Sequence, residues 1–127
     1  MNKKIIYTSK APEAIGAYSQ AVLVGNTLYC SGQIPLIPET MELIGESIDE
    51  QIAQVFDNLS AVVDAAGGDL DSFVKLNVYL TDLSHFAKVN KKMTELFATP
   101  YPARAAVEVK GLPKNVLIEI EGVALIG

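Results

Sequence analysis

Helical periodicity occurs in two stretches of the sequence, both set among strand-like segments, and it restricts the fold to a sheet with two helices. The first stretch begins at Ser47, and residues Ser47 to Glu50 have the pattern of a capping box. Apolar residues then recur at a 3.6-residue spacing as far as Ala66. Gly67-Gly68 follows and is typical of a helix end, because glycine accepts the left-handed conformation there.

The second helical stretch lies between Asp82 and a pair of prolines. Asp82 is the expected N-cap, and the apolar stripe runs from Phe86 to Phe97. Pro100 and Pro102 then stop the helix, because proline lacks the backbone donor and restricts the residue before it.

The other apolar segments are β-branched or alternate with polar residues, which predicts strands. Gly25-Asn26 separates two of them and is typical of a hairpin turn. The predicted order is β-β-β-α-β-α-β-β, a single α+β domain with a six-stranded mixed sheet. The predicted strands are residues 5–8, 18–24, 27–34, 73–80, 103–109 and 116–125.

Two helices can cover only one face of such a sheet, so the other face is open. In strand 103–109 we expect the apolar Ala105, Val107 and Val109 to meet the helices. The open face then carries polar and apolar residues together: Lys75, Asn77, Arg104, Ala106, Glu108, Leu117, Glu119, Glu121, Val123 and Leu125. Such a mixture indicates partial burial against another subunit, and the alternative is a lattice of ion pairs on a solvated sheet.

Composition narrows the class of protein. The chain has 127 residues, 50% of them hydrophobic and 20% charged, which fits one folded domain over residues 1–127. A net charge of −5 argues against a nucleic-acid partner. One Cys and one His argue against a disulfide framework and against a Cys/His metal site. No signal peptide or membrane span is evident, and we expect a cytoplasmic protein.

Two ionisable residues stand out as candidates for chemistry. Arg104 offers a planar fork that suits a carboxylate ligand, but its ordinary interpretation is a pair with a glutamate across the sheet. Glu119 lies among apolar neighbours, where a half-buried carboxyl can move protons, but its ordinary interpretation is an ion pair with Arg104 or a lysine. The turn at 111–115 predicts that their two strands pair and bring both side chains to one face.

Other candidates have ordinary structural interpretations. Tyr18 is predicted to begin a strand, and Cys30 is expected to be a small core residue. Ser31 precedes Gly32, which permits close approach of a ligand. His85 is expected on a helix surface, so a Ser–His pair is not supported.

Several segments together resemble the RidA family, the reactive intermediate deaminases, over essentially the whole chain. They are Ala11–Ala21 (APEAIGAYSQA), Ser31–Pro35 (SGQIP), Pro102–Val109 (PARAAVEV), Leu112–Lys114 (LPK) and Ile118–Glu121 (IEIE). The resemblance implies a chorismate-mutase-like fold and a homotrimer around a central barrel, with three sites between subunits. It also implies hydrolysis of 2-imino acids and their enamine tautomers, such as 2-aminoacrylate, to 2-oxo acids and ammonia. Neither a cofactor nor a metal is implied, and the imines would come from pyridoxal-phosphate-dependent dehydratases.

The resemblance also assigns residues. Arg104 matches the arginine that binds the substrate carboxylate, and Glu119 matches the acidic residue that positions the attacking water. Tyr18 and Ser31 match residues that line the pocket. Ala106 departs from the cysteine found in many members; its backbone N–H can still bind a carboxylate oxygen, but no thiol chemistry is available there.

Other functions stay open at this point. A non-catalytic module that binds 2-oxo or 2-imino acids would need Arg104 but not Glu119. A ribonuclease or translation inhibitor is opposed by the net charge of −5, the lone His and the absence of Trp. A chaperone or other protein-partner role is a further alternative.

Overall fold

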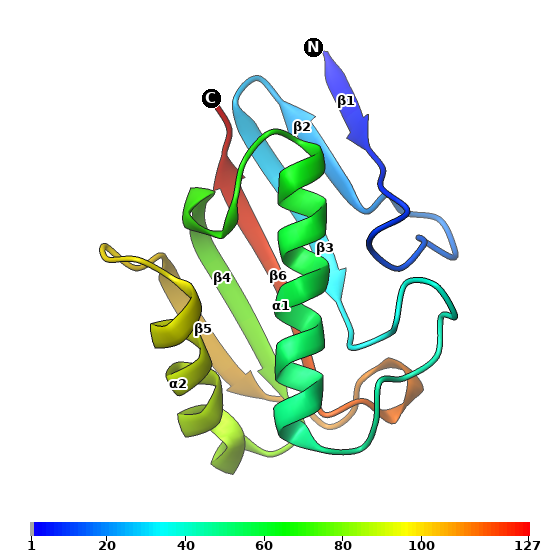
Figure 1. Ribbon diagram of the computed structural model, residues 1–127, viewed down its shortest axis with the longest axis vertical. Helices are drawn as coiled ribbons and strands as arrows, with labels where there is room; N and C mark the ends of the chain where they lie inside the picture. The colour runs from blue at the N-terminus through cyan, green and yellow to red at the C-terminus, as the bar shows by residue number, and fades with distance from the viewer. Residues whose placement is uncertain (1) are drawn as a thin grey trace.

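The computed structural model describes residues 2–127, which form one six-stranded mixed sheet with two α-helices on one face (Figure 1). The predicted fold class is confirmed in these features. The strands lie in the order β1-β2-β3-β6-β4-β5, and every neighbouring pair is antiparallel except β4 and β5. The strands are β1 (Lys3–Ile6), β2 (Ala21–Val24), β3 (Thr27–Gln33), β4 (Phe73–Leu80), β5 (Ala103–Glu108) and β6 (Ile118–Leu125).

Local sequence signals set the ends of helix α1 (Ile48–Ala65). The Glu50 N–H donates to the Ser47 hydroxyl at 3.4 Å, which confirms Ser47 as the N-cap. At the other end Gly67 has a φ of +95°, the left-handed conformation expected just beyond a helix.

Helix α2 (Phe86–Leu96) follows a single turn of 3₁₀ helix, η2 (Leu83–His85). Asp82 caps this short turn rather than α2 itself, since the Ser84 N–H donates to Asp82 Oδ1 at 2.9 Å. Hydrogen bonds from the side chain and the backbone of Ser84 lower the pKa of Asp82. Two further 3₁₀ turns, η1 (Leu70–Ser72) and η3 (Pro113–Asn115), lead into β4 and β6.

The hydrophobic core fills the layer between the helices and the sheet. Phe56 of α1 packs against Phe97, the C-cap of α2, edge to face with ring centroids 5.8 Å apart. The largest completely buried apolar side chains are Phe56, Leu28, Ile52, Leu59, Leu76, Leu80, Ile118 and Ile120. Gly122 belongs to the same layer because a Cβ there would lie 2.8 Å from Leu76 and Phe73.

All the strand predictions need correction near their ends. Strands β3 and β5 each end one residue earlier than expected, and β6 begins two residues later. Strand β1 begins and ends two residues earlier than expected. Strand β2 begins at Ala21, so Tyr18 lies in the preceding loop. Hydrogen bonds from the Gln20 side chain to backbone carbonyls, rather than pairing with another strand, hold this loop. A register shift between Phe73 and Lys75 turns Phe73 into the core and leaves Val74 43% exposed.

The predicted pairing of the last two strands is wrong. Strand β5 pairs only with β4, in parallel, while β6 lies between β3 and β4 and is antiparallel to both. The β4-α2-β5 segment is a parallel crossover, which leaves β5 at the sheet edge. The connection over residues 109–117 is long enough to cross β4, unlike a two-residue hairpin loop.

The predicted orientation of β5 is also wrong. The parallel register pairs Leu76 with Arg104 and Val78 with Ala106, and both β4 residues are buried under the helices. Arg104, Ala106 and Glu108 therefore face the helix side, and the Leu83 N–H donates to Glu108 Oε1 at 2.8 Å. An edge strand beside a helix accepts an arginine facing inward, because its aliphatic stem covers apolar surface while the head reaches water.

Leu117, also predicted on the open face, precedes β6 and packs against the core, while the β6 residues of that face are as predicted. Glu119, Glu121 and Val123 of β6 alternate with buried residues and point away from the helices. This face exposes large apolar side chains, including Ile5, Tyr29, Val107 and Leu125. Within residues 2–127, no helix has both the length and the apolar character needed to cross a membrane.

Candidate functional site

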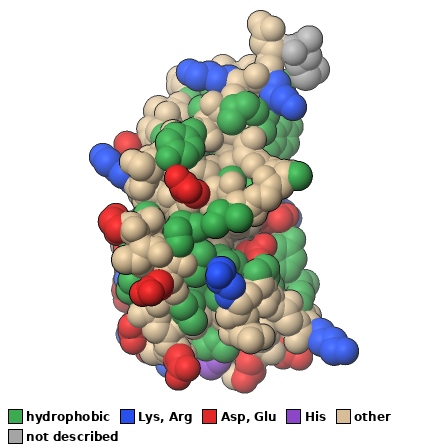
Figure 2. All heavy atoms as spheres, turned by 90° about the vertical axis from the view of Figure 1, so that its right-hand side faces the viewer, with side chains coloured by type: hydrophobic (Ala, Val, Ile, Leu, Met, Phe, Trp, Pro, Cys, Tyr) green, Lys and Arg blue, Asp and Glu red, His purple; other side chains and the backbone are tan. Residues whose placement is uncertain are grey.

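A cavity of about 660 Å³ opens at the edge of the molecule where three loops meet the end of β3 and the start of β6. Figure 2 faces this edge and shows hydrophobic side chains on it, with acidic and basic side chains among them. We call it the loop cavity. Its lining residues are Pro12, Glu13, Ile15, Tyr18, Ser31, Gly32, Gln33, Ile34, Leu36, Met41, Pro113, Lys114, Glu119 and Glu121.

Gln20 fixes the first of these loops, which carries Tyr18. Its buried amide nitrogen donates to the carbonyls of Thr8 at 3.0 Å and Pro12 at 2.8 Å. Its amide oxygen accepts from the Thr8 N–H at 2.8 Å. One side chain therefore satisfies the backbone of a segment that has no strand partner of its own.

Two buried amides on α1 fix the other loops. Asn58 donates to the carbonyls of Ile34 and Leu36, both at 3.1 Å. Gln51 donates to Gly45 O at 2.8 Å and accepts from the Leu117 N–H at 2.7 Å, so it ties the loop before α1 to the start of β6. The walls of the loop cavity are thus set by the helix behind it.

Glu119 is the half-buried carboxyl of the loop cavity. It lies across Gly32, and a Cβ at position 32 would be 2.9 Å from Glu119 Cδ and 3.1 Å from its Cγ. Burial and then the charge of Glu121 raise the pKa of Glu119 above its ordinary value. A carboxyl with a raised pKa in a cavity is suited to accept and return a proton.

Ser31 and Tyr18 lie in the same cavity as Glu119. The Ser31 hydroxyl donates to Ser19 O, and the Ser31 N–H donates to Gln20 O at 3.0 Å. Ser31 therefore joins β3 to the loop that carries Tyr18, whose side chain is 53% exposed. His85 lies in η2 and does not line this cavity, so nothing here activates Ser31 as a nucleophile.

Arg104 occupies a different place from the one expected. Its guanidinium lies 4.7 Å from the centroid of the Phe86 ring, and Nη1 donates to Asn90 Oδ1 at 3.0 Å. Met93 Sδ lies 3.5 Å from the same nitrogen. Arg104 thus lies over α2 at the β5 edge, lining a smaller cavity of about 280 Å³ with Asn90, Met93, Thr94, Tyr101 and Pro102.

Within one chain, Arg104 and Glu119 are not neighbours. Arg104 lies opposite Leu76 of β4, and Glu119 lies opposite Tyr79, three residues further along the same strand. The backbone positions of Arg104 and Glu119 are therefore about 10 Å apart along the strands and about 9.5 Å apart across them, since β4 lies between their two strands. Their side chains also leave opposite faces of the sheet. Ala106 is half-buried on the same face of β5 as Arg104, so it lies near Arg104 and away from Glu119.

Three residues that hold Arg104 were not identified from the sequence: Phe86, Asn90 and Met93. Phe86 and Met93 were assigned only to the apolar stripe of the second helix. Asn90 is a polar residue beside that stripe, which is a weak signal, since many exposed helix residues are polar. Among residues 2–127, no three His, Cys, Asp or Glu side chains are grouped as metal ligands.

Cys30 is buried in β3, as predicted, and burial raises its pKa to about 12. Its thiol faces the core rather than the loop cavity and is held in its neutral form, which is a poor nucleophile.

Known proteins similar to this chain share both its sequence and its fold. Residues 8–126 match the family model described as Endoribonuclease L-PSP. A RutC family protein of Pyrococcus abyssi is 50% identical over 98% of this chain and 98% of its own length. The 2-iminobutanoate/2-iminopropanoate deaminase of Rattus norvegicus is 46% identical over 98% of this chain and 91% of its own.

Two solved structures illustrate the similarity of the fold. RidA from the Antarctic bacterium Psychrobacter sp. PAMC 21119 superposes with a TM-score of 0.93, is 54% identical, and covers 97% of this chain and 99% of its own. TdcF of E. coli, crystallised with bound serine, has a TM-score of 0.89 at 39% identity over 98% and 99% of the two chains.

Proposed function

Because the chain belongs to the RidA family, which the Endoribonuclease L-PSP model describes, we propose that it hydrolyses 2-imino acids to 2-oxo acids and ammonia. The observation that carries the proposal is the half-buried Glu119 carboxyl, which lines the loop cavity and accepts no hydrogen bond from residues 2–127. A carboxyl in that setting is available to a water molecule and to a substrate nitrogen.

The site is completed by a second copy of the chain. A four-carbon imino acid cannot reach Arg104 and Glu119 of one chain, because they lie two strands apart on opposite faces of the sheet. The β5 edge of a neighbouring subunit, placed over the loop cavity, would bring its Arg104 to the substrate carboxylate. The exposed apolar residues of the open face favour such an assembly, and we propose the homotrimer implied by the family.

The residues of both subunits divide the reaction between them. Arg104 holds the carboxylate through its guanidinium fork, with the Ala106 N–H as a further donor. Glu119 accepts a proton as water adds to the carbon of the protonated imine (C=NH2⁺) and the C=N electron pair moves to nitrogen, which becomes a neutral –NH2. Glu119 then returns the proton to nitrogen, which becomes –NH3⁺, and takes the hydroxyl proton as the C–N bond breaks, so that neutral ammonia leaves and the carbonyl forms.

This division requires no cofactor in the hydrolytic step, because an imine carbon is already electrophilic and the protein supplies orientation and proton transfer. The imines and enamines, such as 2-aminoacrylate, would be supplied by pyridoxal-phosphate-dependent serine or threonine dehydratases. Both enzymes would then work in the cytoplasm.

The direct test couples a threonine dehydratase to the purified protein and traps residual imine with semicarbazide. We expect faster formation of 2-oxobutyrate and less trapped product with the wild-type chain. Retention of Arg104-dependent binding of 2-oxobutyrate without any hydrolysis would identify a binding module instead. Cleavage of RNA under the same conditions would favour a ribonuclease.

Mixing two inactive variants tests the shared site. Glu119→Gln and Arg104→Ala are refolded separately and together. In a random mixed trimer, about a quarter of the interfaces join an intact Glu119 to an intact Arg104, so about a quarter of wild-type activity should return. Activity that does not exceed that of the separate variants would show that one chain supplies both residues or that they do not share a site.

A further inference from the structure

Glu119 shares its face of β6 with a second carboxylate, Glu121, and the two have different surroundings. Both line the loop cavity, and one residue separates them along the strand. Two carboxyl groups placed so close cannot both be easily ionised, so their neighbours decide which one keeps its proton to higher pH.

Glu121 is anchored by the neighbouring strand. Asn77 lies opposite it in the β4–β6 register, and Asn77 Nδ2 donates to Glu121 Oε2 at 3.1 Å. An amide donor favours the charged form of a carboxylate. Tyr79 lies opposite Glu119 in the same register, which puts its phenol on the face of the pair. Burial, followed by hydrogen bonding to Glu121 and the charges of both glutamates, raises the pKa of Tyr79.

Glu119 has no such anchor. Its carboxyl lies over Gly32, and no hydrogen-bond donor among residues 2–127 reaches it. It therefore experiences the negative charge of Glu121 without compensation from a donor of its own.

On the basis of the proposed function, we propose that Glu121, held by Asn77, is a positioning residue whose fixed negative charge makes Glu119 the group that takes and returns the proton. The nearby charge raises the affinity of Glu119 for a proton and brings it nearer to the range in which a carboxyl can act as both base and acid. Glu121 itself need not touch the substrate.

The other titratable groups on this part of the molecule are few. Strand β4 presents Lys75 and Tyr79 on the same face, and the loops contribute Glu13, Tyr18 and Lys114 to the cavity. In the proposed assembly the neighbouring subunit's Arg104 also faces the cavity, both in wild type and in the variants compared below. Of these, Lys75 is opposite Val123, further along the ladder from Glu119. Glu121 is therefore the anion best placed to act on Glu119.

The experiment compares wild type with Glu121→Gln by two measurements. Protein labelled with ¹³C at glutamate Cδ gives the titration of Glu119 by NMR, assigned by the signal that is lost in Glu119→Gln. The pH dependence of kcat and KM for imine hydrolysis gives the acid limb of the rate profile. In Glu121→Gln we expect both midpoints to move to lower pH by about 0.5–1 unit, with KM changed less than twofold.

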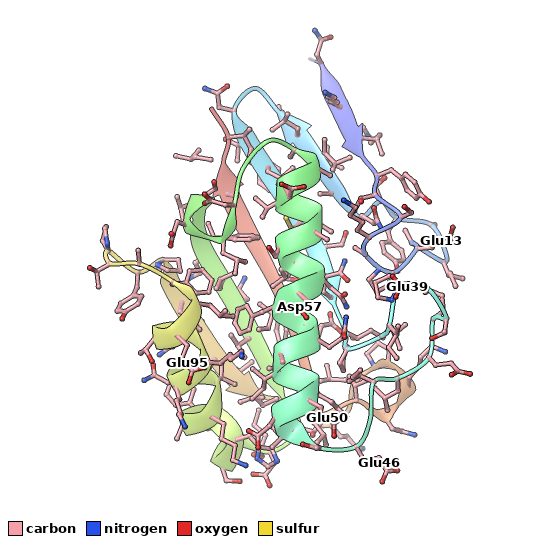
Figure 3. All side chains as sticks on the ribbon, in the orientation of Figure 1. Glu13, Glu39, Glu46, Glu50, Asp57 and Glu95 are labelled. Atoms are coloured by element: carbon pink, nitrogen blue, oxygen red, sulfur yellow. The ribbon has the colours of Figure 1, made fainter. Side chains whose placement is uncertain are left out.

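Glu46→Gln is the matched control, because Glu46 is exposed, lies on the outside of the loop before α1, and does not line the cavity (Figure 3). It should leave both midpoints in place. Glu121→Ala removes the same charge if Glu121→Gln does not fold. Midpoints that stay in place in Glu121→Gln would overturn the inference, as would an NMR shift without a matching shift in the rate profile. Absence of hydrolysis by wild type would instead contradict the proposed function itself.

Discussion

The carboxyl group of Glu119 occupies the space that a side chain at Gly32 would need. The two residues belong to β6 and β3, strands that are neighbours in the sheet but distant in the sequence. Glycine at position 32 is thus required by contact with Glu119 rather than by its backbone angles, and it fixes how deeply the carboxyl can lie in the cavity.

Gly32→Ala should therefore damage activity more than stability. The new Cβ would lie 2.9 Å from Glu119 Cδ, so the flexible end of the glutamate must move. A displacement of about 1 Å can cost about 10²-fold in rate, and we expect kcat to fall by about that factor while the protein stays folded. Gly111→Ala is the control, because a Cβ there meets nothing within 4 Å. Equal kcat values for the two variants would contradict the assigned role of Glu119.

Glu119→Gln should have opposite effects on rate and stability. Hydrolysis should fall by about 10²-fold or more, because the amide cannot accept the proton. Affinity for 2-oxobutyrate, measured by calorimetry, should change only a few-fold, since Arg104 still holds the carboxylate. Loss of both together would make Glu119 a structural residue, and loss of neither would place the water elsewhere, for example on Ser31.

The stability of Glu119→Gln follows from the sign of the pKa shift. Since the folded-state pKa of Glu119 is raised, wild-type stability falls as pH rises from the unfolded-state pKa through the folded-state pKa. Above that window the charged carboxylate opposes folding, and glutamine removes this cost. We expect the Tm of Glu119→Gln to exceed that of wild type by roughly 1–3 °C at pH 7.5, with the difference shrinking below pH 4.

Arg104→Lys should not be a conservative change. The guanidinium both stacks on Phe86 and donates to Asn90, and a lysine ammonium cannot do both while offering two parallel donors to a carboxylate. We expect kcat/KM to fall about ten- to a hundredfold, equivalent to about 1.5–3 kcal/mol. Asn90→Ala should give a smaller loss, and Lys91→Ala on the same helix should give none. Wild-type efficiency in folded Arg104→Lys would place the carboxylate contact elsewhere.

The sequence predicted the helices well because their signals are local. Ser47 and Gly67 mark the ends of α1 within a few residues of chain, and the apolar stripe identifies the face between them. The neighbours and orientation of β5 depend instead on contacts distant in sequence. Alternation separates Arg104 and Ala106 from Ala105 and Val107, but it does not say which set faces the helices.

The same distinction applies to the site. The resemblance grouped Tyr18, Ser31 and Glu119, and the structure places all three in one cavity. It also grouped Arg104 with them, although in a single chain Arg104 lies at the β5 edge. No local pattern could reveal that separation, because it arises from where β6 inserts into the sheet.

The last prediction concerns position 106, where many family members have cysteine. Ala106→Cys should leave kcat/KM within a few-fold of wild type, because the position is proposed to contribute its backbone N–H and the substitution preserves that donor.

The Ala106→Cys variant should also gain a reactive thiol. Cys30 is buried and its pKa is raised to about 12, so native wild-type protein should resist a thiol reagent at pH 8 and react only after denaturation. Native Ala106→Cys should incorporate one label per chain, and 2-oxobutyrate should slow the labelling. Labelling of native wild type would show that β3 opens readily. A large gain of activity in Ala106→Cys would show that a thiol takes part in the chemistry, which the proposed mechanism excludes.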